Sequence, residues 1–202
     1  MSVVVLAISY MLGSVSVGYL FGKVKGIDVR SLGSGNIGTT NILRTMGVVP
    51  AILVLVLDAM KGLVAVLLAN WLVGIPAVSM LCGIAAVVGH NWPLWFEFKG
   101  GRGIATSMGV ILAFNPLLLL VLAIFATTII FITRYVSLGS MTAATRFPPF
   151  LLILRNTATI ETNSLVILLS FILTGLAFFR HRDNIKRLRQ GTESKIGERI
   201  RQ

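Results

Sequence analysis

The segment that decides the fold runs from Gly33 to Arg44 and reads G-S-G-N-I-G-T-T-N-I-L-R. It lies between two long apolar runs, Val3–Phe21 and Val48–Leu72. Because about 20 apolar residues span a bilayer, each run predicts a membrane-spanning helix, and the polar segment between them must lie at a membrane surface. Its glycines let backbone N–H groups approach an anion closely, and its hydroxyl and amide side chains add donors. We interpret it as a phosphate-binding segment.

Two nucleotide-binding motifs are excluded here. Gly33, Gly35 and Gly38 match G-x-G-x-x-G, but that motif follows a strand of a soluble sheet, whereas a predicted membrane helix precedes this one. Gly33 and Gly38 also have the spacing of a P-loop, but Thr39 stands where that loop requires lysine. A flexible connector is the remaining alternative, and it would not need so many donors or Arg44.

The composition indicates an integral membrane protein. Of 202 residues, 55% are hydrophobic and only 12% are charged, against about 25% charged in a typical soluble domain. The net charge of +11 comes from basic residues near the ends of the predicted helices. Membrane topology and anionic lipid explain these residues better than nucleic acid does, so we expect membrane lipid as a partner and no nucleic acid. The single cysteine, Cys82, is expected to pack in an apolar run.

The remaining apolar runs bring the predicted number of spans to seven, in one domain over residues 1–202 with a basic tail at 191–202. The run Ile104–Thr133 is too long for one span, and Asn115-Pro116 divides it into two. The spans are Val3–Phe21, Val48–Leu72, Pro76–Val88, the two parts of Ile104–Thr133, Val136–Leu154 and Ser164–Phe179. We expect the first of them to be retained and not a cleaved signal peptide, because no basic segment precedes it.

Basic residues are distributed very unequally over the two sides of this arrangement. If the polar segment after the first span is cytoplasmic, that side holds 15 Lys and Arg residues and the other side holds only Arg155. Because basic residues concentrate on the cytoplasmic side, the N-terminus is predicted outside (periplasmic) and the C-terminus in the cytoplasm. A five-span arrangement, with the weaker segments at the interface, would keep the polar segments on the same side.

A second polar segment, Phe98–Gly103, reads F-K-G-G-R-G and leads directly into an apolar run. Its glycine N–H groups would lie at a helix N-terminus, where the helix dipole favours an anion, and Lys99 and Arg102 add positive charge. The alternative is a basic pair that extends toward a membrane surface. The presence of Gly33–Arg44 on the same face favours anion binding.

Other polar residues have structural interpretations that compete with functional ones. Ser137 and Ser140 lie at the start of a span, where serines usually cap helices. His181 and Asn184 are three residues apart and would share one face of a continuous helix.

Three ionisable residues lie within or at the ends of apolar runs. We expect His90 to be structural. Asp58 and Lys61, at i and i+3, are expected to form an ion pair or to bond a polar loop, because ionisable groups at membrane depth need partners. No His, Cys, Asp and Glu residues have the spacing of metal ligands, so we expect no metal and no cofactor.

Several stretches together resemble the cytoplasmic motifs of the bacterial acyl-phosphate:glycerol-3-phosphate acyltransferases, the PlsY family. These are Gly33–Arg44, Gly89-His90 with Phe98–Gly103, and His181–Leu188, supported by Asp58, Lys61 and the Tyr135-Val-Ser-Leu stretch. The resemblance spans the whole chain. It implies an all-α inner-membrane enzyme of seven helices, with its active site at the cytoplasmic face. Such enzymes transfer a fatty acyl group from acyl phosphate to the 1-hydroxyl of glycerol 3-phosphate, giving lysophosphatidic acid and inorganic phosphate.

The resemblance also implies which residues act. Ser34 and its neighbours would form the phosphate pocket, and the residues that hold glycerol 3-phosphate would be Arg44, Arg102, Ser140, His181 and Asn184. The residues carried over as catalytic are Ser34, Arg44, Arg102, His181 and Asn184. Those carried over as substrate-binding are Gly33, Ser34, Gly35, Asn36, Gly38, Thr40, Asn41, Arg44, Lys99, Gly100, Gly101, Arg102, Gly103, Ser137, Ser140, His181 and Asn184.

Three residues depart from the family pattern: Thr39 stands where Ala is common, Arg102 where Lys is usual, and Asp183 where Glu is usual. The His-x4-Asp arrangement of other glycerolipid acyltransferases is absent, because Trp95 and Lys186 stand where its aspartate would. The acyl donor must therefore be activated already, as acyl phosphate is. The general base stays open between His181 and the acyl phosphate itself.

The competing functional hypothesis is a membrane transporter of phosphate or of an organic anion, with the polar segments as binding sites in broken helices. A transporter should place its polar groups near the middle of the membrane and show inverted repeats. Here the polar segments gather on one predicted face, and the sequence shows no repeat. The oligomeric state is open, and a monomer is compatible with the sequence.

Overall fold

All regular secondary structure in the computed structural model is helical within residues 1–156 and 164–198, which are the residues that the structure describes. The chain forms two compact units: one is Met1–Ala113 with the chain end from Gly197, and the other is Phe114–Ile196. The expectation of an all-α fold is confirmed for the described residues. Each unit is described by itself below.

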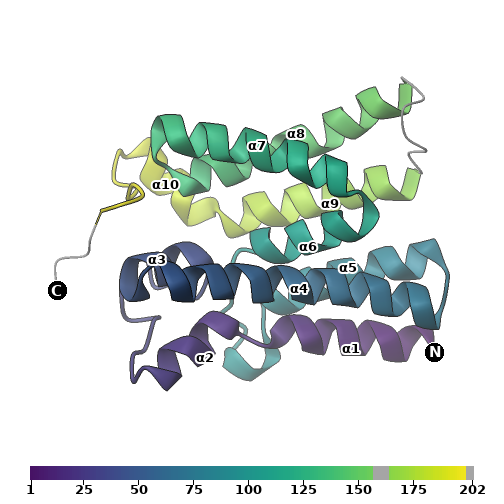
Figure 1. Ribbon diagram of the computed structural model, residues 1–202, viewed down its shortest axis with the longest axis horizontal. Helices are drawn as coiled ribbons and strands as arrows, with labels where there is room; N and C mark the ends of the chain where they lie inside the picture. The colour runs from purple at the N-terminus through teal and green to yellow at the C-terminus, as the bar shows by residue number, and fades with distance from the viewer. Residues whose placement is uncertain (157–163, 199–202) are drawn as a thin grey trace. The chain divides into compact units, whose positions relative to one another are not determined.

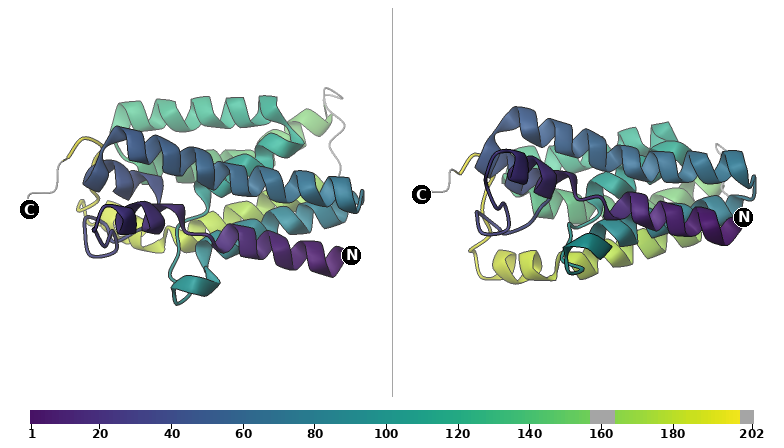
Figure 2. Two further views of the ribbon diagram at one scale, coloured as in Figure 1. Left: turned by 60° about the horizontal axis from the view of Figure 1, so that its bottom comes forward. Right: turned by 90° about the horizontal axis from the view of Figure 1, so that it is seen from below.

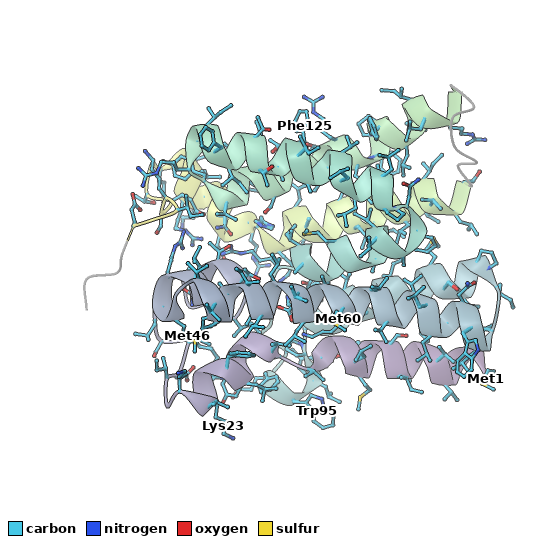
Figure 3. The ribbon with its side chains drawn as sticks, in the orientation of Figure 1. Met1, Lys23, Met46, Met60, Trp95 and Phe125 are labelled. Atoms are coloured by element: carbon cyan, nitrogen blue, oxygen red, sulfur yellow. The ribbon has the colours of Figure 1, made fainter. Side chains whose placement is uncertain are left out.

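The first unit is built on three long helices that run side by side (Figure 1). They are α1 (Ser2–Ser14), α4 (Val48–Leu72) and α5 (Pro76–Asn91). The shorter helices α2 (Val17–Val24) and α3 (Thr39–Met46) lie between α1 and α4, and the 3-10 turn η1 (Leu94–Phe96) and α6 (Ile104–Phe114) follow α5. Figure 2 shows the turn at Leu94–Phe96 standing out from the helices of this unit. In Figure 3, Lys23 and Met46 lie at one end of the unit and Met1 lies at the other.

Glycines set the distance between neighbouring helices in this unit. A Cβ at Gly13 of α1 would overlap the Ala86 carbonyl of α5, and one at Gly89 of α5 would overlap the Tyr10 carbonyl of α1. The α4–α6 pair repeats this pattern, since Gly62 faces the Thr106 carbonyl and Gly109 faces the Ala59 carbonyl. Small residues allow such close packing where no hydrophobic effect drives helices together.

The first predicted span is not one continuous helix. It consists of α1 and α2, and the helix is interrupted at Val15 and Ser16, where the backbone is extended. The prediction of an unbroken helix over Val3–Phe21 was therefore wrong at this point. The interruption turns the Val15 carbonyl toward the Lys61 ammonium group, which donates a hydrogen bond to it. An apolar sequence pattern cannot reveal a break that is stabilised by a side chain 46 residues away.

The second unit contains α7 (Pro116–Thr133), α8 (Val136–Asn156), α9 (Ser164–Arg180) and α10 (Arg182–Arg189). α8 packs against both α7 and α9. The predicted division at Asn115-Pro116 is confirmed, because the Asn115 side chain accepts a hydrogen bond of 2.9 Å from the Leu118 N–H and caps α7. The first N–H groups of a helix have no partner within the helix, so Pro116, which has no N–H, loses no hydrogen bond at the start of α7.

Among the described residues, four helical segments are long and apolar enough to cross a membrane: Ser2–Val24, Val48–Leu72, Pro76–Phe96 and Pro116–Thr133. A fifth is obtained if α9 and α10, which meet at a bend of 58°, count as one span. α6 is also apolar, but its 11 residues are too few to cross a membrane. α8, which contains Arg146, Pro148 and Pro149, is not among the candidates. A multi-pass membrane protein is thus supported, whereas the predicted number of seven spans stays a prediction.

Candidate functional site

The first polar segment, Gly33–Arg44, is half loop and half helix. α3 begins at Thr39, so Thr40, Asn41 and Arg44 are presented on a helix that the sequence analysis did not anticipate. Gly33 and Gly35 have left-handed backbone conformations, with φ of 62° and 68°. Residues with a Cβ rarely adopt this conformation, which accounts for glycine at both positions.

Asn41 holds the loop in place. Its side-chain amide donates to the carbonyls of Val29 and Leu32, at 3.0 and 3.1 Å, and its oxygen accepts from the Ser34 N–H at 2.9 Å. Asn41 is 1% exposed, whereas Ser34 is exposed at the surface of the loop. The geometry therefore gives Asn41 a positioning role and leaves Ser34 accessible to a ligand.

Asn36 and Gly38 complete the turn. The Asn36 side-chain oxygen accepts a hydrogen bond of 2.8 Å from the Gly38 N–H, and Gly38 is the residue that precedes α3. An asparagine oxygen that bonds the backbone two residues on fixes a tight turn. Arg44, in the last turn of α3, is half-buried.

Residues in or next to both polar segments of the first unit contact helix α2. The guanidinium of Arg30, just before Gly33, lies over the Tyr19 ring at 4.9 Å, and the Tyr19 and Phe96 ring centroids are 4.7 Å apart. Phe96 in turn lies just before Phe98–Gly103. A Cβ at Gly18 would overlap the Ile37 carbonyl, so the first segment also lies directly on α2. Residues that flank the two segments therefore meet at α2 within this unit, and the shared cytoplasmic face stays a prediction.

The second polar segment is folded against the end of α5. The Gly101 N–H donates to the His90 carbonyl at 3.0 Å. Neither Gly100 nor Gly101 has room for a Cβ, because the first would overlap the His90 carbonyl and the second the His90 ring. Gly103, with φ of 77°, immediately precedes α6. The segment therefore brings its backbone to a helix N-terminus, as predicted, which is an arrangement that favours anions.

The two cations of this segment have different surroundings. Lys99 forms a surface ion pair with Glu97 at 2.8 Å, and both side chains are about three-quarters exposed. The hydrogen bond and charge of Lys99 lower the pKa of the Glu97 carboxyl below its usual value. Such exposed pairs are weak. Arg102 is half-buried, which makes it the better placed of the two to bind an anion firmly.

Asp58 and Lys61 form a buried ion pair in α4, as predicted. The Lys61 Nζ lies 2.5 Å from the Asp58 Oδ1, and the two side chains are 5% and 2% exposed. The His90 Nδ1 lies 3.7 Å from the same Asp58 oxygen. His90 is 5% exposed, in agreement with the structural role expected for it.

In the second unit, Ser137 and Asn184 are joined by a residue that the sequence analysis missed. The Glu193 carboxylate accepts hydrogen bonds from the Ser137 hydroxyl at 2.7 Å, the Asn184 amide at 2.6 Å and the Arg187 Nε at 2.7 Å. Glu193 belongs to the segment 191–202, which the sequence presents as a basic tail. An acid next to Gly191-Thr192 in an otherwise basic stretch was the available signal.

The environment of Glu193 has opposing effects on its pKa. Burial alone would raise the pKa, but the hydrogen bonds from Ser137, Asn184 and Arg187, together with the charge of Arg187, outweigh burial. The pKa is therefore lowered, and the carboxylate stays charged at neutral pH. The tail is also tied down beyond this point, because the Ile196 N–H donates to the Arg134 carbonyl at 2.8 Å.

His181 lies at the bend between α9 and α10. The helix is interrupted there, so the condition under which His181 and Asn184 would share a face of one continuous helix is not met. The His181 Nδ1 lies 2.7 Å from the Ala177 carbonyl oxygen. Because a carbonyl can only accept, Nδ1 carries the proton, and the lone pair of the neutral ring is on Nε2. His181 and Asn184 are each 2% exposed, and Ser140 is half-buried.

Taken together, the apolar helices and the polar segments define an integral membrane protein with groups suited to anions. The family model for glycerol-3-phosphate acyltransferase matches residues 3–191. This chain belongs to the glycerol-3-phosphate acyltransferase family.

The chain is similar over nearly its full length to curated members of this family. It is 45% identical to a glycerol-3-phosphate acyltransferase of Thermoanaerobacter sp. (strain X514), over 95% of this chain and 94% of the relative. It is 44% identical to glycerol-3-phosphate acyltransferase 2 of Moorella thermoacetica, over 96% and 97%. A crystal structure of PlsY, an integral membrane glycerol 3-phosphate acyltransferase, in its glycerol 3-phosphate form matches with a TM-score of 0.90. That match has 36% identity and covers 97% of this chain and 96% of the other.

Proposed function

We propose that this protein transfers a fatty acyl group from acyl phosphate to the 1-hydroxyl of glycerol 3-phosphate. The observation that carries the proposal is the match to glycerol-3-phosphate acyltransferases over 95% of the chain, which includes the polar segments of both units. The acceptor is further supported by the solved relatives, which are described as glycerol 3-phosphate and lysophosphatidic acid forms of PlsY.

The donor follows from the chemistry that the residues can supply. Acyl phosphate is a mixed anhydride with a good leaving group, so transfer needs neither a covalent acyl-enzyme nor a metal. The bond between the acyl carbon and the phosphate oxygen breaks, and an ester bond to the acceptor oxygen forms. The hydroxyl proton leaves with the phosphate, and the products are lysophosphatidic acid and inorganic phosphate. The protein has to position two anions and offset their repulsion.

In the first unit we propose that the two polar segments, Gly33–Arg44 and Phe98–Gly103, bind the phosphate groups of the substrates. The exposed Ser34, with the backbone of Gly33 to Gly38, is proposed to bind the phosphate that departs. Arg44 and Arg102 are proposed to bind the phosphate of the acceptor, because a guanidinium binds phosphate through two parallel hydrogen bonds. Arg102 stands at the N-terminus of α6, where the helix dipole adds to its charge.

In the second unit we assign roles in acceptor binding to Ser140, His181 and Asn184. The Nδ1 of His181 faces the Ala177 carbonyl, and Nε2 is the ring nitrogen that we propose acts on the acceptor. The acyl phosphate itself is the other proposed base, and we favour it because it is present whenever the reaction occurs. Ser137 and Asn184 are already bonded to Glu193, so we propose that Ser137 mainly positions this group.

We further propose seven membrane spans, with the N-terminus outside, the C-terminus in the cytoplasm and the protein in the bacterial inner membrane. The distribution of basic residues supports this orientation. The five-span arrangement keeps the same orientation for the polar segments, so the proposed chemistry stays on the cytoplasmic side in either case. A monomer is proposed as the working unit.

The test is an assay of purified protein with labelled glycerol 3-phosphate and one of three donors: acyl phosphate, acyl-CoA or acyl carrier protein. Labelled lysophosphatidic acid is expected with acyl phosphate alone. Robust transfer from acyl-CoA with none from acyl phosphate would contradict the donor assignment and leave the family membership intact. An Arg102→Ala variant purified in parallel, and assayed at glycerol 3-phosphate concentrations well below the wild-type KM, controls for contaminating host enzyme.

A further inference from the structure

The buried Asp58–Lys61 pair is connected to the second polar segment through His90. Asp58 and Lys61 lie near the middle of α4, at the level marked by Met60 in Figure 3. The Asp58 Oδ1 lies 2.5 Å from the Lys61 Nζ and 3.7 Å from the His90 Nδ1. The carboxylate therefore has a positive group on one side and an imidazole nitrogen on the other.

His90 supports the second segment through its backbone and its ring. Its carbonyl accepts the Gly101 N–H at 3.0 Å. Its ring lies so close to Gly101 that a Cβ there would overlap the ring nitrogen Nε2. One edge of the imidazole thus faces Asp58 and the other faces the Gly101 backbone. A rotation of the ring away from Asp58 would displace the glycines that precede α6.

Helix α4 also holds the other end of the segment. Gly62, next to Lys61, lies directly against the Thr106 carbonyl in the first turn of α6, and Ala59 lies against Gly109. The segment is therefore held at both ends by α4, through His90 on one side and through α6 on the other. Lys61 in addition links α4 to the first span, because its ammonium group donates to the Val15 carbonyl at the break between α1 and α2.

A buried ion pair is a poor device for stability alone. Removing two charges from water is costly, and replacing such a pair with apolar residues is often neutral or stabilising. Stability alone therefore does not explain the pair, and the position of Asp58 beside His90 points to a second role. A carboxylate beside a histidine commonly fixes the orientation of its ring.

We propose that Asp58, Lys61 and His90 are positioning residues that hold the Lys99–Gly103 segment in the geometry required to bind the acceptor phosphate. This inference rests on the proposed function and adds a role for residues deep in the helices. Asp58 orients the His90 ring, the ring supports Gly100 and Gly101, and Lys61 balances the Asp58 charge. None of the three touches substrate.

The test is the double variant Asp58→Leu/Lys61→Met, which removes both charges together and keeps similar side-chain volumes. We expect it to remain folded, with a KM for glycerol 3-phosphate raised at least tenfold and an unchanged KM for acyl phosphate. His90→Gln should raise the same KM. The matched control is Ser79→Ala, which removes another buried polar group from α5, the helix of His90, and should leave both KM values unchanged.

The outcomes are distinguishable from failure of the proposed function. Wild-type protein without acyl transfer contradicts that function. An active wild type and a double variant with altered thermal unfolding but an unchanged KM for glycerol 3-phosphate would overturn the positioning role. If the double variant does not fold, Asp58→Asn, which keeps the shape of the side chain, replaces it. Calorimetric binding of glycerol 3-phosphate without donor provides a readout independent of turnover, and at least tenfold weaker binding by the variant is expected.

Discussion

The side-chain amide of Asn184 donates a hydrogen bond of 2.6 Å to the carboxylate of Glu193, nine residues later in the chain. This contact closes a turn after α10 and places a negative charge among Ser137, Asn184 and Arg187. Ser137 comes from α8 and Asn184 from α10, so one carboxylate ties two helices of the second unit together. A chain truncated at the end of α10 would lack this connection.

Replacing Glu193 should therefore destabilise the second unit. Glu193→Ala removes the shared acceptor of Ser137, Asn184 and Arg187, and an unpaired buried donor costs about 1–3 kcal/mol. Glu193→Gln should be milder, because it keeps one acceptor oxygen. The measurement is the thermal unfolding midpoint in detergent. Asp183→Asn, an exposed change that also removes a negative charge, is the control and should shift the midpoint less. An unchanged midpoint for Glu193→Ala would refute the structural role of the carboxylate.

The lowered pKa of Glu193 also predicts a pH dependence. The ordinary value is near 4.5, and the folded value lies below it. The carboxylate thus contributes stability that is fully present above pH 4.5 and is lost as the pH falls through the folded pKa. The difference in unfolding midpoint between wild type and Glu193→Gln should be constant from pH 7 to pH 6 and should shrink below pH 4.5. If the difference in unfolding midpoint grew as the pH fell, the pKa of Glu193 would be raised by folding and not lowered.

Arg44→Ala and Arg102→Ala should each weaken binding of the acceptor. Loss of one charge-assisted hydrogen bond to a phosphate costs about 1.5–3 kcal/mol, which corresponds to roughly a 10- to 150-fold rise in the KM for glycerol 3-phosphate. Arg102→Lys should be milder, because lysine retains the charge but not the planar fork of donors. Steady-state kinetics with varied acceptor provide the measurement. If neither alanine variant changes this KM, the assignment of the acceptor phosphate is wrong.

Ser34→Ala should instead lower turnover. A hydroxyl directed at the departing phosphate is most effective as charge develops there, so its loss appears in kcat more than in either KM. We expect a decrease of about 10-fold or more, since a donor to a charged group contributes about 1.5–3 kcal/mol. Ser31→Ala, an exposed serine upstream of Gly33, is the control and should retain wild-type turnover. A strong rise in the KM for glycerol 3-phosphate with unchanged kcat would mean that the two phosphate sites are interchanged.

The orientation can be tested with single cysteines in a Cys82→Ser background. Cysteines at Ser31 and Thr192, both exposed positions on the predicted cytoplasmic side, should be protected from impermeant thiol reagents in intact cells. A cysteine at Ile75, which is 51% exposed at the start of α5, should react. Labelling after cell lysis shows that all three are accessible in principle. The reverse labelling pattern in intact cells would show that the proposed orientation is wrong.

The sequence predicted most of the fold because apolar length determines membrane helices directly. Val48–Leu72 was predicted with its observed bounds, and Asn115-Pro116 marked the division between α6 and α7. The break at Val15 and Ser16 could not be predicted, because it depends on a hydrogen bond from Lys61 that is long-range in the sequence. The end of α9 was predicted to within one residue, at Phe179, but the bend of 58° between α9 and α10 was not predicted.

For the candidate site, the glycines of both polar segments were predictable, because an anion-binding backbone requires them. The different roles of neighbouring residues could not be predicted from the sequence. Asn41 and Ser34 were both expected to bind substrate, yet Asn41 is buried in loop contacts and Ser34 is exposed. Glu193 was missed because its partners lie 56, 9 and 6 residues away, and no local pattern signals a contact of that kind.

The glycine contacts between helices limit how this protein can be engineered. Exchanging glycine for alanine inside helices is a standard way to raise stability, because it reduces the entropy of the unfolded chain. Here the same exchange at Gly13, Gly62, Gly89 or Gly109 would force two backbones apart. A stabilisation programme should therefore spare these four helical glycines and direct its alanine substitutions to Gly175, where an added Cβ meets open space.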